Sequence, residues 1–445
     1  MDALARQVVY QVFPEAFGGL EGVTEHLDHL AGLGVTTVYL TPIVPAPTDH
    51  RYDATDLSAV DPALGGEPAL ERLLAGLHGR GMHLVLDLVL NHVSDRHPWF
   101  RAALAGDPAY RGFFTFLPDG RYQCWKGFRG MPELDLAEGA VLDRLYRGPG
   151  SVVERWLDLG VDGLRFDVAQ DVGLAVAEDL AARVRERWPR CLLIGEVFGY
   201  GGGWCRGFHG TMNYYHQNAL LSWLNGEIGA VQANRAVADV REGWGLDGAL
   251  RSWNMLSSHD TPRLRSALAD AGGIDLAQLA QMTLPGVPLV YYGEEVGMEG
   301  GADPDNRRPM VWDPARWDRG RLAWTRKLIA LRRGSPELMS GDVKVLGDRL
   351  PGNALVFLRY TEQPGEAALV VVNAASDPLR AKLLIPYPHW PDGVPLRDAL
   401  GQAGEVTVRT SSVALDLAPR SGAVYRAVEP LETYRYFKPR NRADA

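Results

Sequence analysis

Four short segments each place a carboxylic acid where an apolar run of the sequence ends. They are Asp87–His92, Gly163–Asp167, Gly195–Val197 and Ser258–Asp260. Two carboxyl groups in one cavity can divide the work of a nucleophile and a general acid/base. We therefore expect covalent or acid–base chemistry on residues from these segments. The candidate catalytic residues are Asp167, Glu196 and Asp260.

The surroundings of two of these acids differ. Arg165 and Asp167 are two residues apart on one predicted strand, so their side chains share a face, and the guanidinium favours an ionised carboxylate that suits a nucleophile. Glu196 lies in the segment Gly-Glu-Val-Phe without an adjacent cation, so partial desolvation should raise its pKa and keep it protonated. Two carboxyl groups with diverging pKa values are typical of glycoside hydrolysis.

Eight short apolar or β-branched runs alternate with segments of helical period. Parallel strands joined by crossover helices produce this pattern, and eight units predict an α/β fold, the (β/α)8 or TIM barrel. In such a barrel the polar residues at strand C-termini surround the catalytic mouth, so the acids should converge there. The predicted strands are Val8–Phe13, Thr36–Leu40, His83–Leu88, Gly163–Phe166, Cys191–Gly195, Phe208–Met212, Trp253–Leu256 and Pro288–Tyr291.

Two stretches depart from a minimal barrel. Residues 91–135 are aromatic and punctuated by Gly and Pro, which predicts a small inserted lid after the third strand. Beyond residue 334 the hydrophobic period becomes 2, as in Ala354–Leu358, Ala368–Asn373 and Val406–Arg409, which predicts an antiparallel β domain. The expected units are the barrel (1–90 and 136–334), the lid (91–135), a C-terminal β-sandwich (335–428) and a tail (429–445).

Composition excludes several classes of partner. The 445 residues carry 46 basic and 55 acidic side chains, a net charge of −9, without a dense basic stripe, so we expect no nucleic acid partner. No apolar run approaches the length of a membrane span, and Met1–Gln7 does not resemble the start of a signal peptide. The cysteines at 124, 191 and 205 lack disulfide or zinc-site spacing. These features predict a cytoplasmic location.

The motifs together identify a resemblance. With Val9–Pro14, His50–Asp56 and Pro285–Glu295, the four acid-bearing segments resemble, in order, the signatures of the α-amylase family of glycoside hydrolases. The likeness spans essentially the whole chain. Met131–Asp135 is similar to the Met-Pro-x-Leu signature of the neopullulanase, cyclomaltodextrinase and maltogenic amylase branch, and Asp303–Arg307 to its Asp-Pro-Asp-x-Arg segment.

The resemblance implies a retaining α-glucan hydrolase acting on maltooligosaccharides, cyclodextrins or pullulan-like substrates. It assigns the nucleophile to Asp167, the general acid/base to Glu196 and transition-state stabilisation to Asp260. It makes Tyr52 a platform for the sugar, and it places Asp303 and Arg307 on the next glucose inward. The full set of implied substrate-binding residues is His50, Tyr52, His92, Arg165, Phe198, His259, Asp303 and Arg307.

Some positions depart from that branch. The domain that precedes the barrel in longer relatives is missing before Val8, which favours a monomer over their domain-swapped dimer. Phe17–Leu20 is too short for the Asn/Asp-rich calcium loop of many relatives, so we do not favour a structural calcium ion there. Asn91 could be a ligand of a second calcium ion at another site. We expect no required cofactor. Phe198 replaces a Trp, and Gln170-Asp171 replaces Asn-Glu, so the balance between hydrolysis and sugar transfer stays open.

Alternatives remain at this stage. A glucanotransferase or a trehalose-synthase-like isomerase would use the same intermediate, and a barrel of this kind could also be a non-catalytic carbohydrate-binding protein. For Asp87, a salt bridge to Arg165 is favoured over substrate contact, and Met131 is expected to pack within the lid. Trp125 and Phe128 could line the cleft or pack in the lid. Preference for α-1,4 or α-1,6 bonds is not encoded in the three acids.

Overall fold

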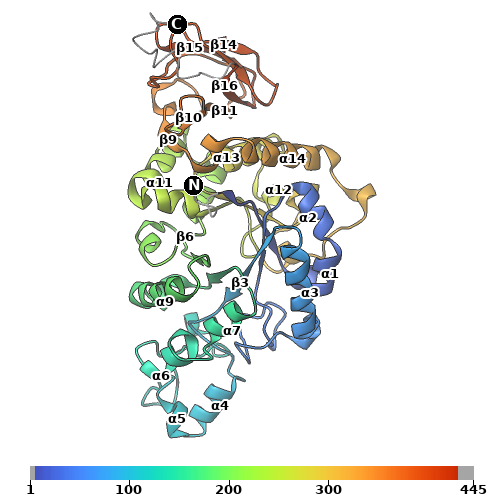
Figure 1. Ribbon diagram of the computed structural model, residues 1–445, viewed down its shortest axis with the longest axis vertical. Helices are drawn as coiled ribbons and strands as arrows, with labels where there is room; N and C mark the ends of the chain where they lie inside the picture. Colours follow the sequence, from blue (N-terminus) through green and yellow to red (C-terminus); the bar gives the residue numbers. More distant parts are fainter. Residues whose placement is uncertain (1–5, 429–445) are drawn as a thin grey trace, which may run out of the picture.

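Eight short, buried strands form the centre of the structure, a computed structural model that describes residues 6–428. Each strand pairs in parallel with its neighbours in the order β6-β5-β4-β3-β2-β1-β8-β7, and a bridge between Met212 and Trp253 joins the two ends. Figure 1 labels β3 and β6 of this sheet. The predicted (β/α)8 barrel is therefore confirmed. The strands are β1 (Val9–Val12), β2 (Thr37–Leu40), β3 (His83–Leu88), β4 (Gly163–Phe166), β5 (Leu192–Gly195), β6 (Gly210–Thr211), β7 (Trp253–Met255) and β8 (Val287–Tyr291).

The observed strands overlap all eight predicted ones, and β6 differs most. It covers Gly210–Thr211 rather than Phe208–Met212, and the Phe208 ring stacks on Phe166 with 5.2 Å between centroids. This stacking also explains Gly195, because a Cβ there would lie 2.5 Å from the Phe208 ring. Phe208 can pack so closely only because the residue before Glu196 is glycine.

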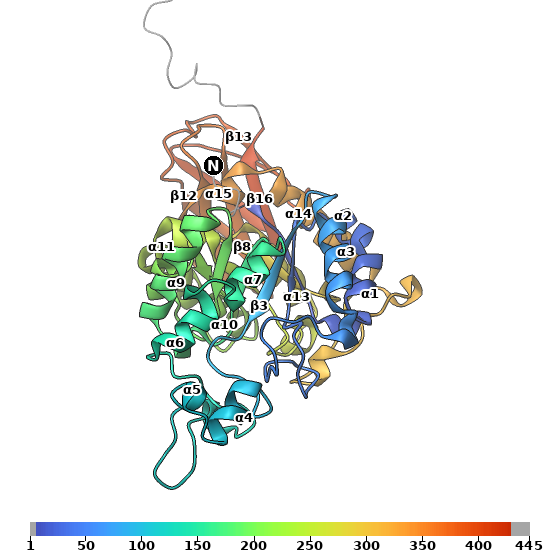
Figure 2. The same cartoon turned by 60° about the horizontal axis from the view of Figure 1, so that its bottom comes forward.

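Amphipathic helices surround the barrel, as Figure 2 shows. Helix α7 is an example: the Ser151 side chain caps its start by accepting from the Glu154 N–H at 3.4 Å, and Trp156 and Leu157 are buried. No helix within residues 6–428 is long and apolar enough to cross a membrane. The barrel helices are α1 (Leu20–Glu25), α2 (Leu27–Leu33), α3 (Gly66–His78), α6 (Gly139–Leu142), α7 (Val152–Asp158), α8 (Ala169–Val172), α9 (Leu174–Arg187), α10 (Tyr214–Leu224), α11 (Ala230–Arg251), α12 (Leu264–Ala267), α13 (Gly272–Thr283) and α14 (Arg319–Arg333).

Single turns lie in the connecting loops, several of them at the mouth. Eight are 3-10 turns and η5 is a π-turn: η2 (Pro14–Phe17), η3 (Pro62–Leu64), η4 (Trp125–Gly127), η5 (Asp143–Arg147), η6 (Gly202–Arg206), η7 (Glu294–Val296), η8 (Asp305–Arg307), η9 (Pro314–Arg316) and η10 (Gly347–Arg349).

The segment after β3 forms a small projecting unit with helices α4 (Pro98–Leu104) and α5 (Pro108–Arg111). It lies at the end of the molecule opposite the C-terminal strands, as both views show (Figures 1 and 2). Its core is aromatic: Phe100 packs edge-on against Phe114 and Tyr122. Antiparallel bridges from His92 to Glu133 and from Cys124 to Pro132 return the chain to the barrel mouth.

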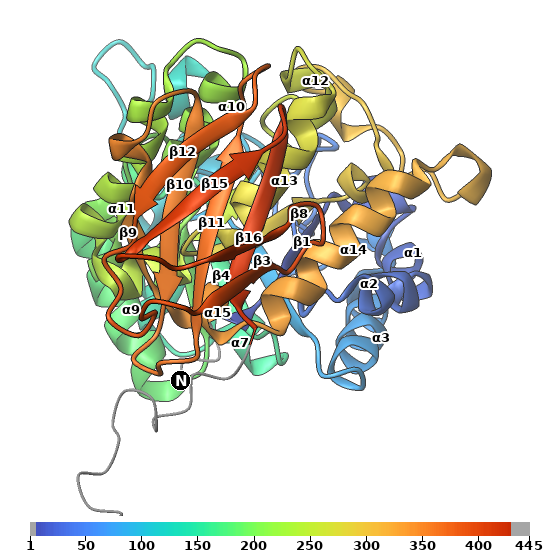
Figure 3. The ribbon, with the colours of Figure 1, turned by 90° about the horizontal axis from the view of Figure 1, so that it is seen from above.

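The C-terminal strands form two antiparallel sheets with a shared hydrophobic core (Figure 3). The larger sheet has the order β14-β13-β16-β11-β10-β9, and β12 pairs with β15. At the barrel, buried Arg359 donates to the carbonyl oxygens of Thr283 and Gly341. The remaining elements are α15 (Pro336–Ser340), β9 (Asp342–Val345), β10 (Ala354–Tyr360), β11 (Ala367–Asn373), β12 (Leu379–Leu384), β13 (Pro395–Asp398), β14 (Glu405–Thr407), β15 (Ser412–Leu417) and β16 (Ser421–Ala427).

Candidate active site

One fully buried arginine connects carboxylates from three neighbouring strands. Arg165 Nη1 lies 2.7 Å from Asp87 Oδ1 and 3.1 Å from Asp167 Oδ1, and its Nη2 lies 2.5 Å from Glu196 Oε1. Asp87 is on β3, Arg165 on β4, Asp167 follows β4, and Glu196 follows β5. The strand ends therefore bring these acids together, as the barrel predicts.

Asp87 fixes the position of Arg165 and of two tyrosine hydroxyls. Its Oδ2 accepts hydrogen bonds from the hydroxyls of Tyr39 at 2.7 Å and Tyr52 at 2.8 Å, while both carboxylate oxygens accept from Arg165. Burial raises the pKa of Asp87 to about 6, against the opposing effect of the Arg165 guanidinium. Its lone pairs are thus used within the protein, in agreement with the expected salt bridge to Arg165.

The expectation that Glu196 has no adjacent cation is wrong. The β4–β5 register pairs Arg165 with Ile194, two residues before Glu196 and on the same face, so the guanidinium reaches the carboxylate. Glu196 Oε1 also accepts from the Tyr214 hydroxyl at 3.2 Å. This cation comes from the neighbouring strand, so the residues next to Glu196 in the sequence cannot reveal it.

A strained residue supplies a further donor to Glu196. Val168 has a φ of 38°, a left-handed conformation that is costly for a β-branched residue, and its N–H donates to Glu196 Oε2 at 3.0 Å. Val168 directly follows Asp167. The same turn therefore sets the position of one carboxylate and donates to the other.

The expected ionisation of Asp167 also needs correction. Burial, followed by the negative charge of Glu196, raises the pKa of Asp167 well above its usual range, and Arg165 only partly opposes this. Beside burial, the balance of charge contributes, because three carboxylates surround a single guanidinium. Asp167 therefore holds a proton to a higher pH than an ordinary aspartate.

The third predicted acid approaches from the loop after β7. Asp260 Oδ2 lies 3.0 Å from His259 Nε2, and Asp260 Oδ1 lies 3.4 Å from Arg307 Nη2. Arg307 Nε lies 3.2 Å from Asp303 Oδ1. Burial raises the pKa of Asp260, and the positive charges of Arg165 and Arg307 oppose it.

Tyr52 and His259 form a parallel pair beside these acids. Their rings are 5.6 Å apart at an interplanar angle of 8°, and the Tyr52 hydroxyl lies 2.5 Å from His259 Nε2. The side-chain amide of Gln11 contacts His259 Nδ1 at 2.6 Å. Burial and the nearby arginines lower the pKa of His259 well below its usual range. A neutral imidazole held in this way gives the neighbouring hydroxyl a fixed partner.

His92 and His50 also lie at the cavity. His92 is fully buried, burial lowers its pKa to about 4, and its Nε2 has no hydrogen-bond partner within residues 6–428. A neutral, unpartnered ring nitrogen can bond a ligand hydroxyl. The His50 ring faces Tyr52 at 6.0 Å, and partial burial lowers its pKa.

Nine of the eleven predicted site residues line one cavity of about 450 Å³: Asp167, Glu196, Asp260, His50, Tyr52, His92, Phe198, Asp303 and Arg307. The other two, Arg165 and His259, are buried and contact these residues directly. The remaining lining residues are Trp125, Lys126, Phe128, Met131 and Val168. The cavity thus combines acidic, imidazole and aromatic groups, as a neutral sugar requires.

Comparison with known proteins agrees with this geometry. The sequence profile described as "Alpha amylase, catalytic domain" matches residues 11–325. This chain belongs to the alpha-amylase family. Neopullulanase 2 of Thermoactinomyces vulgaris is 32% identical over 445 residues, covering 90% of this chain and 75% of that protein. Cyclomaltodextrinase of Geobacillus thermopakistaniensis (strain MAS1) is 32% identical over 429 residues, covering 93% and 71%.

Solved structures extend the comparison across the C-terminal strands. Ttha1563 from Thermus thermophilus has a TM-score of 0.86 and 29% identity, covering 96% of this chain and 100% of that chain. Cyclic alpha-maltosyl-(1→6)-maltose hydrolase from Arthrobacter globiformis has a TM-score of 0.80 and 26% identity, covering 95% and 98%. As a member of the alpha-amylase family the chain is a glycoside hydrolase of the neopullulanase and cyclomaltodextrinase type.

In this family member the lid contributes an aromatic wall to the cavity. The Trp125 ring stacks on His92 at 5.3 Å and on Phe128 at 5.9 Å, and its indole N–H donates to Asp171 at 3.0 Å. The sequence leaves open whether Trp125 and Phe128 line the cleft or pack in the lid. In the structure both residues line the cavity. Met131, which is half-buried, also lines it.

Lys126 was not anticipated as a site residue. It occupies a left-handed conformation with φ 45°, and its Nζ lies 4.6 Å from the Trp125 ring and 5.9 Å from the Phe198 ring. A single lysine in a loop belongs to no recognised motif, so the sequence alone does not predict Lys126 as a site residue. Asparagine or glycine is the usual occupant of such a turn, so the left-handed conformation is costly for Lys126.

The metal-ligating potential of the described residues is limited. Between residues 6 and 428 no cluster of three or more His, Cys, Asp or Glu side chains could hold an ion. Asn91, named above as a possible calcium ligand, has its amide nitrogen 3.4 Å from His92 Nδ1.

Proposed function

We propose that this chain is a retaining α-glucan hydrolase that cleaves α-glucosidic bonds through a covalent glycosyl-enzyme. One observation carries the proposal: Asp167 and Glu196 follow register-paired residues of adjacent strands and share one guanidinium. Adjacent strands lie about 4.8 Å apart, which favours the short carboxyl separation of about 5–5.5 Å of a retaining mechanism.

The steps follow from the positions of the acids. Asp167 attacks the anomeric carbon while Glu196 gives its proton to the bridging oxygen, so the glycosidic bond breaks as the ester bond forms. Glu196 then takes a proton from water, whose oxygen replaces Asp167 at the carbon. Asp260 offsets the positive charge that develops on the sugar ring in both transition states.

The chemistry of the lining supports a neutral glucan as substrate. Tyr52 offers a ring to the apolar face of a pyranose, and His92 and Arg307 offer groups for hydroxyls. The relatives named neopullulanase and cyclomaltodextrinase act, by those names, on pullulan and cyclodextrins. We extend the proposal to maltooligosaccharides, cyclodextrins and pullulan-like chains.

A cytoplasmic location is part of the proposal. Cys124, Cys191 and Cys205 are free thiols, which suits a reducing compartment. A relative named intracellular maltogenic amylase, from Bacillus subtilis, is 32% identical over 337 residues, covering 73% of this chain and 56% of that protein.

Proton NMR during hydrolysis of maltotriose tests the proposal. A retaining enzyme releases α-configured reducing ends first, before mutarotation, and gives glucose and maltose. First appearance of the β-anomer would contradict the retaining mechanism. Longer or rearranged saccharides as main products would instead favour a transferase or isomerase, and no reaction across linear, cyclic and branched glucans would favour a binding protein.

A further inference from the structure

Gln11 places a polar amide in the interior of the barrel. It lies on β1 two residues after Val9, so both side chains point to the same side of the strand, and Val9 packs in the apolar core of the barrel. Gln11 is fully buried, and its register partners are Tyr39 on β2 and Tyr291 on β8. Because a buried amide needs polar partners, the contacts of Gln11 indicate its role.

The Gln11 amide faces the ring of His259. Its Nε2 lies 2.6 Å from His259 Nδ1, whereas its Oε1 is buried and has no hydrogen-bond partner within residues 6–428. An unpaired buried oxygen lowers the stability of the folded chain. Stability alone therefore does not account for a glutamine at this position, and the contact of its nitrogen with His259 needs its own explanation.

The hydrogen bonds on the other side of the ring show which nitrogen of His259 carries the proton. The Tyr52 hydroxyl donates to Asp87 Oδ2 at 2.8 Å, so the Tyr52 oxygen is left to accept from His259 Nε2 at 2.5 Å. The Asp260 carboxylate, which only accepts when it is ionised, lies 3.0 Å from the same Nε2. Both neighbours therefore require a hydrogen on Nε2.

The charge of the ring then determines what Nδ1 needs. Burial and the positive charges of Arg165 and Arg307 lower the pKa of His259 well below its usual range. A charged His50 acts in the same direction, and the negative charge of Glu196 acts against it. The ring is therefore neutral. A neutral imidazole with its hydrogen on Nε2 has a lone pair on Nδ1, so the barrel must supply a donor there.

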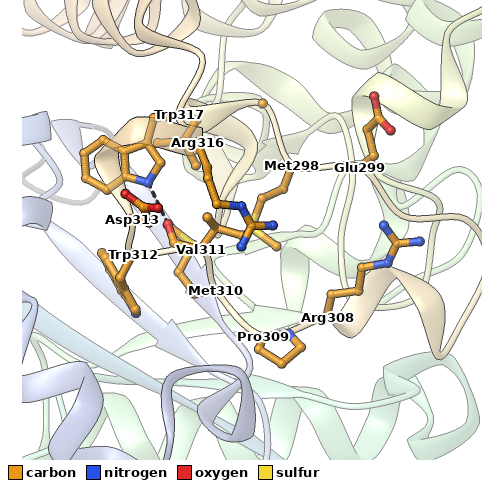
Figure 4. Close-up of a pocket in the computed structure, with 12 residues that line it drawn as sticks. Met298, Glu299, Arg308, Pro309, Met310, Val311, Trp312, Asp313, Arg316 and Trp317 are labelled. Atoms are coloured by element: carbon orange, nitrogen blue, oxygen red, sulfur yellow. Dashed lines mark hydrogen bonds between the residues drawn. The ribbon is translucent and has the colours of Figure 1, made fainter.

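The main chain of His259 is held separately from its ring. The His259 carbonyl oxygen accepts from Asn306 Nδ2 at 2.7 Å and from Arg307 Nε at 2.9 Å. Both donors belong to η8, and residues 308–313, which follow it, line the hollow of about 590 Å³ shown in Figure 4. These two bonds end on the main chain, so the proton on the ring is controlled by the side chains that face it.

We propose that Gln11 is a positioning residue: by donating to His259 Nδ1, its amide nitrogen keeps the His259 proton on Nε2, directed toward Tyr52 and Asp260. This inference rests on the proposed function, in which Asp260 stabilises the transition state. In this tautomer His259 donates to the Asp260 carboxylate and holds it as an ionised acceptor. Gln11 is fully buried and acts only through His259.

Nitrogen-15 NMR of enzyme labelled at its histidines reads the tautomer directly. The chain has 11 histidines, and the signals of His259 are those lost in His259→Gln. We expect a protonated Nε2 and an unprotonated Nδ1 in the parent. In Gln11→Met, which keeps the side-chain length without the donor, part of the proton should move to Nδ1. A proton on Nδ1 in the parent, or an unaltered ring in Gln11→Met, would overturn the inference.

Kinetic measurements compare Gln11→Met with Gln281→Met. Gln281 is also a buried glutamine, but its amide donates to the carbonyl oxygens of Asn254 and Leu289, which makes it a matched structural control. We expect Gln11→Met to lower kcat for maltotriose about tenfold, the scale of one lost hydrogen bond, with a change in KM of less than about twofold. Gln281→Met should leave both unchanged. Equal effects of the two substitutions would overturn the inference.

Gln11→Glu tests the donor itself, and it also serves if Gln11→Met does not fold. The introduced carboxyl can donate to Nδ1 only while it is protonated. The ratio of kcat/KM in the variant to kcat/KM in the parent should be near one at low pH and fall about tenfold as pH rises through the pKa of that carboxyl. Altered packing would lower the ratio equally at every pH, so a ratio independent of pH contradicts the role of Gln11. If the parent cleaves no glucan, the proposed function fails, and the NMR signals alone decide on Gln11.

Discussion

The guanidinium of Arg165 lies 2.5 Å from the carboxylate of Glu196, and the same side chain also holds Asp167 at 3.1 Å. A single buried cation thus orients both acids that the mechanism requires. The negative charge of Glu196 also raises the pKa of Asp167, so the two acids are coupled. The acid limb of the pH profile should reflect that coupling.

Glu196→Gln tests this coupling. Removing the negative charge of Glu196 removes one cause of the raised pKa of Asp167, so Asp167 should ionise at lower pH. With α-maltosyl fluoride, whose leaving group needs little acid catalysis, the variant should retain activity. Because Asp167 acts as the anion, activity is lost as pH falls through its pKa, and the acid limb of kcat/KM should move to lower pH in the variant. An acid limb that stays in place or moves upward would contradict the coupling.

Trp125→Phe tests the connection between the lid and the barrel. The change keeps an aromatic ring beside His92 but removes the indole donor to Asp171. A less fixed lid should bind substrate more weakly, with KM for maltohexaose rising about threefold to tenfold and kcat changing little, the range of one lost hydrogen bond. A fall in kcat at unchanged KM would show that Trp125 acts on the chemical step instead.

His216 should make stability dependent on pH. It is fully buried, its Nδ1 contacts the side-chain amide of Asn213 at 2.9 Å, and burial lowers its pKa to about 4. Below pH 6.5 His216 is protonated in the unfolded chain, whereas in the folded chain it stays neutral down to about pH 4. The free energy of unfolding therefore decreases as the pH falls from 6.5 to 4. His216 should cost about 2 kcal/mol of unfolding free energy between pH 7 and pH 5.

Urea unfolding of a His216→Gln variant at both pH values checks this expectation. The variant is less stable at pH 7 because the buried network is altered, but its loss of stability between pH 7 and pH 5 should be smaller than that of the parent. His92 and His97, whose pKa values burial also lowers to about 4, leave part of the dependence in place. An equal loss in both proteins would contradict the role of His216.

The sequence predicts the barrel well because the alternation of apolar runs and helical segments can be read from neighbouring residues. Buried parallel strands need short apolar runs, and their C-terminal ends must face one mouth, so the sequence predicts that Asp167, Glu196 and Asp260 converge. The predicted β6 is too long, since the stacking of Phe208 on Phe166 depends on side chains from another strand.

Electrostatics was the weakest part of the prediction. Arg165 is two residues from Asp167 in the sequence, so the local pattern overstates its effect on that acid. The contact of Arg165 with Glu196 arises only from the register of β4 and β5. Gln11, Tyr39 and Tyr214 support the site through contacts across the barrel. Such contacts join residues far apart in the chain, and no local motif marks them.

The proposed mechanism requires that Asp167 forms a covalent bond to the anomeric carbon of the substrate. Incubation with a 5-fluoro-α-glycosyl fluoride slows the second step and accumulates the intermediate, and peptide mass spectrometry then locates the sugar. We predict a glycosylated peptide with the label on Asp167, and no label in Asp167→Asn. A label on Glu196 or Asp260, or rapid turnover without any labelled peptide, would contradict it.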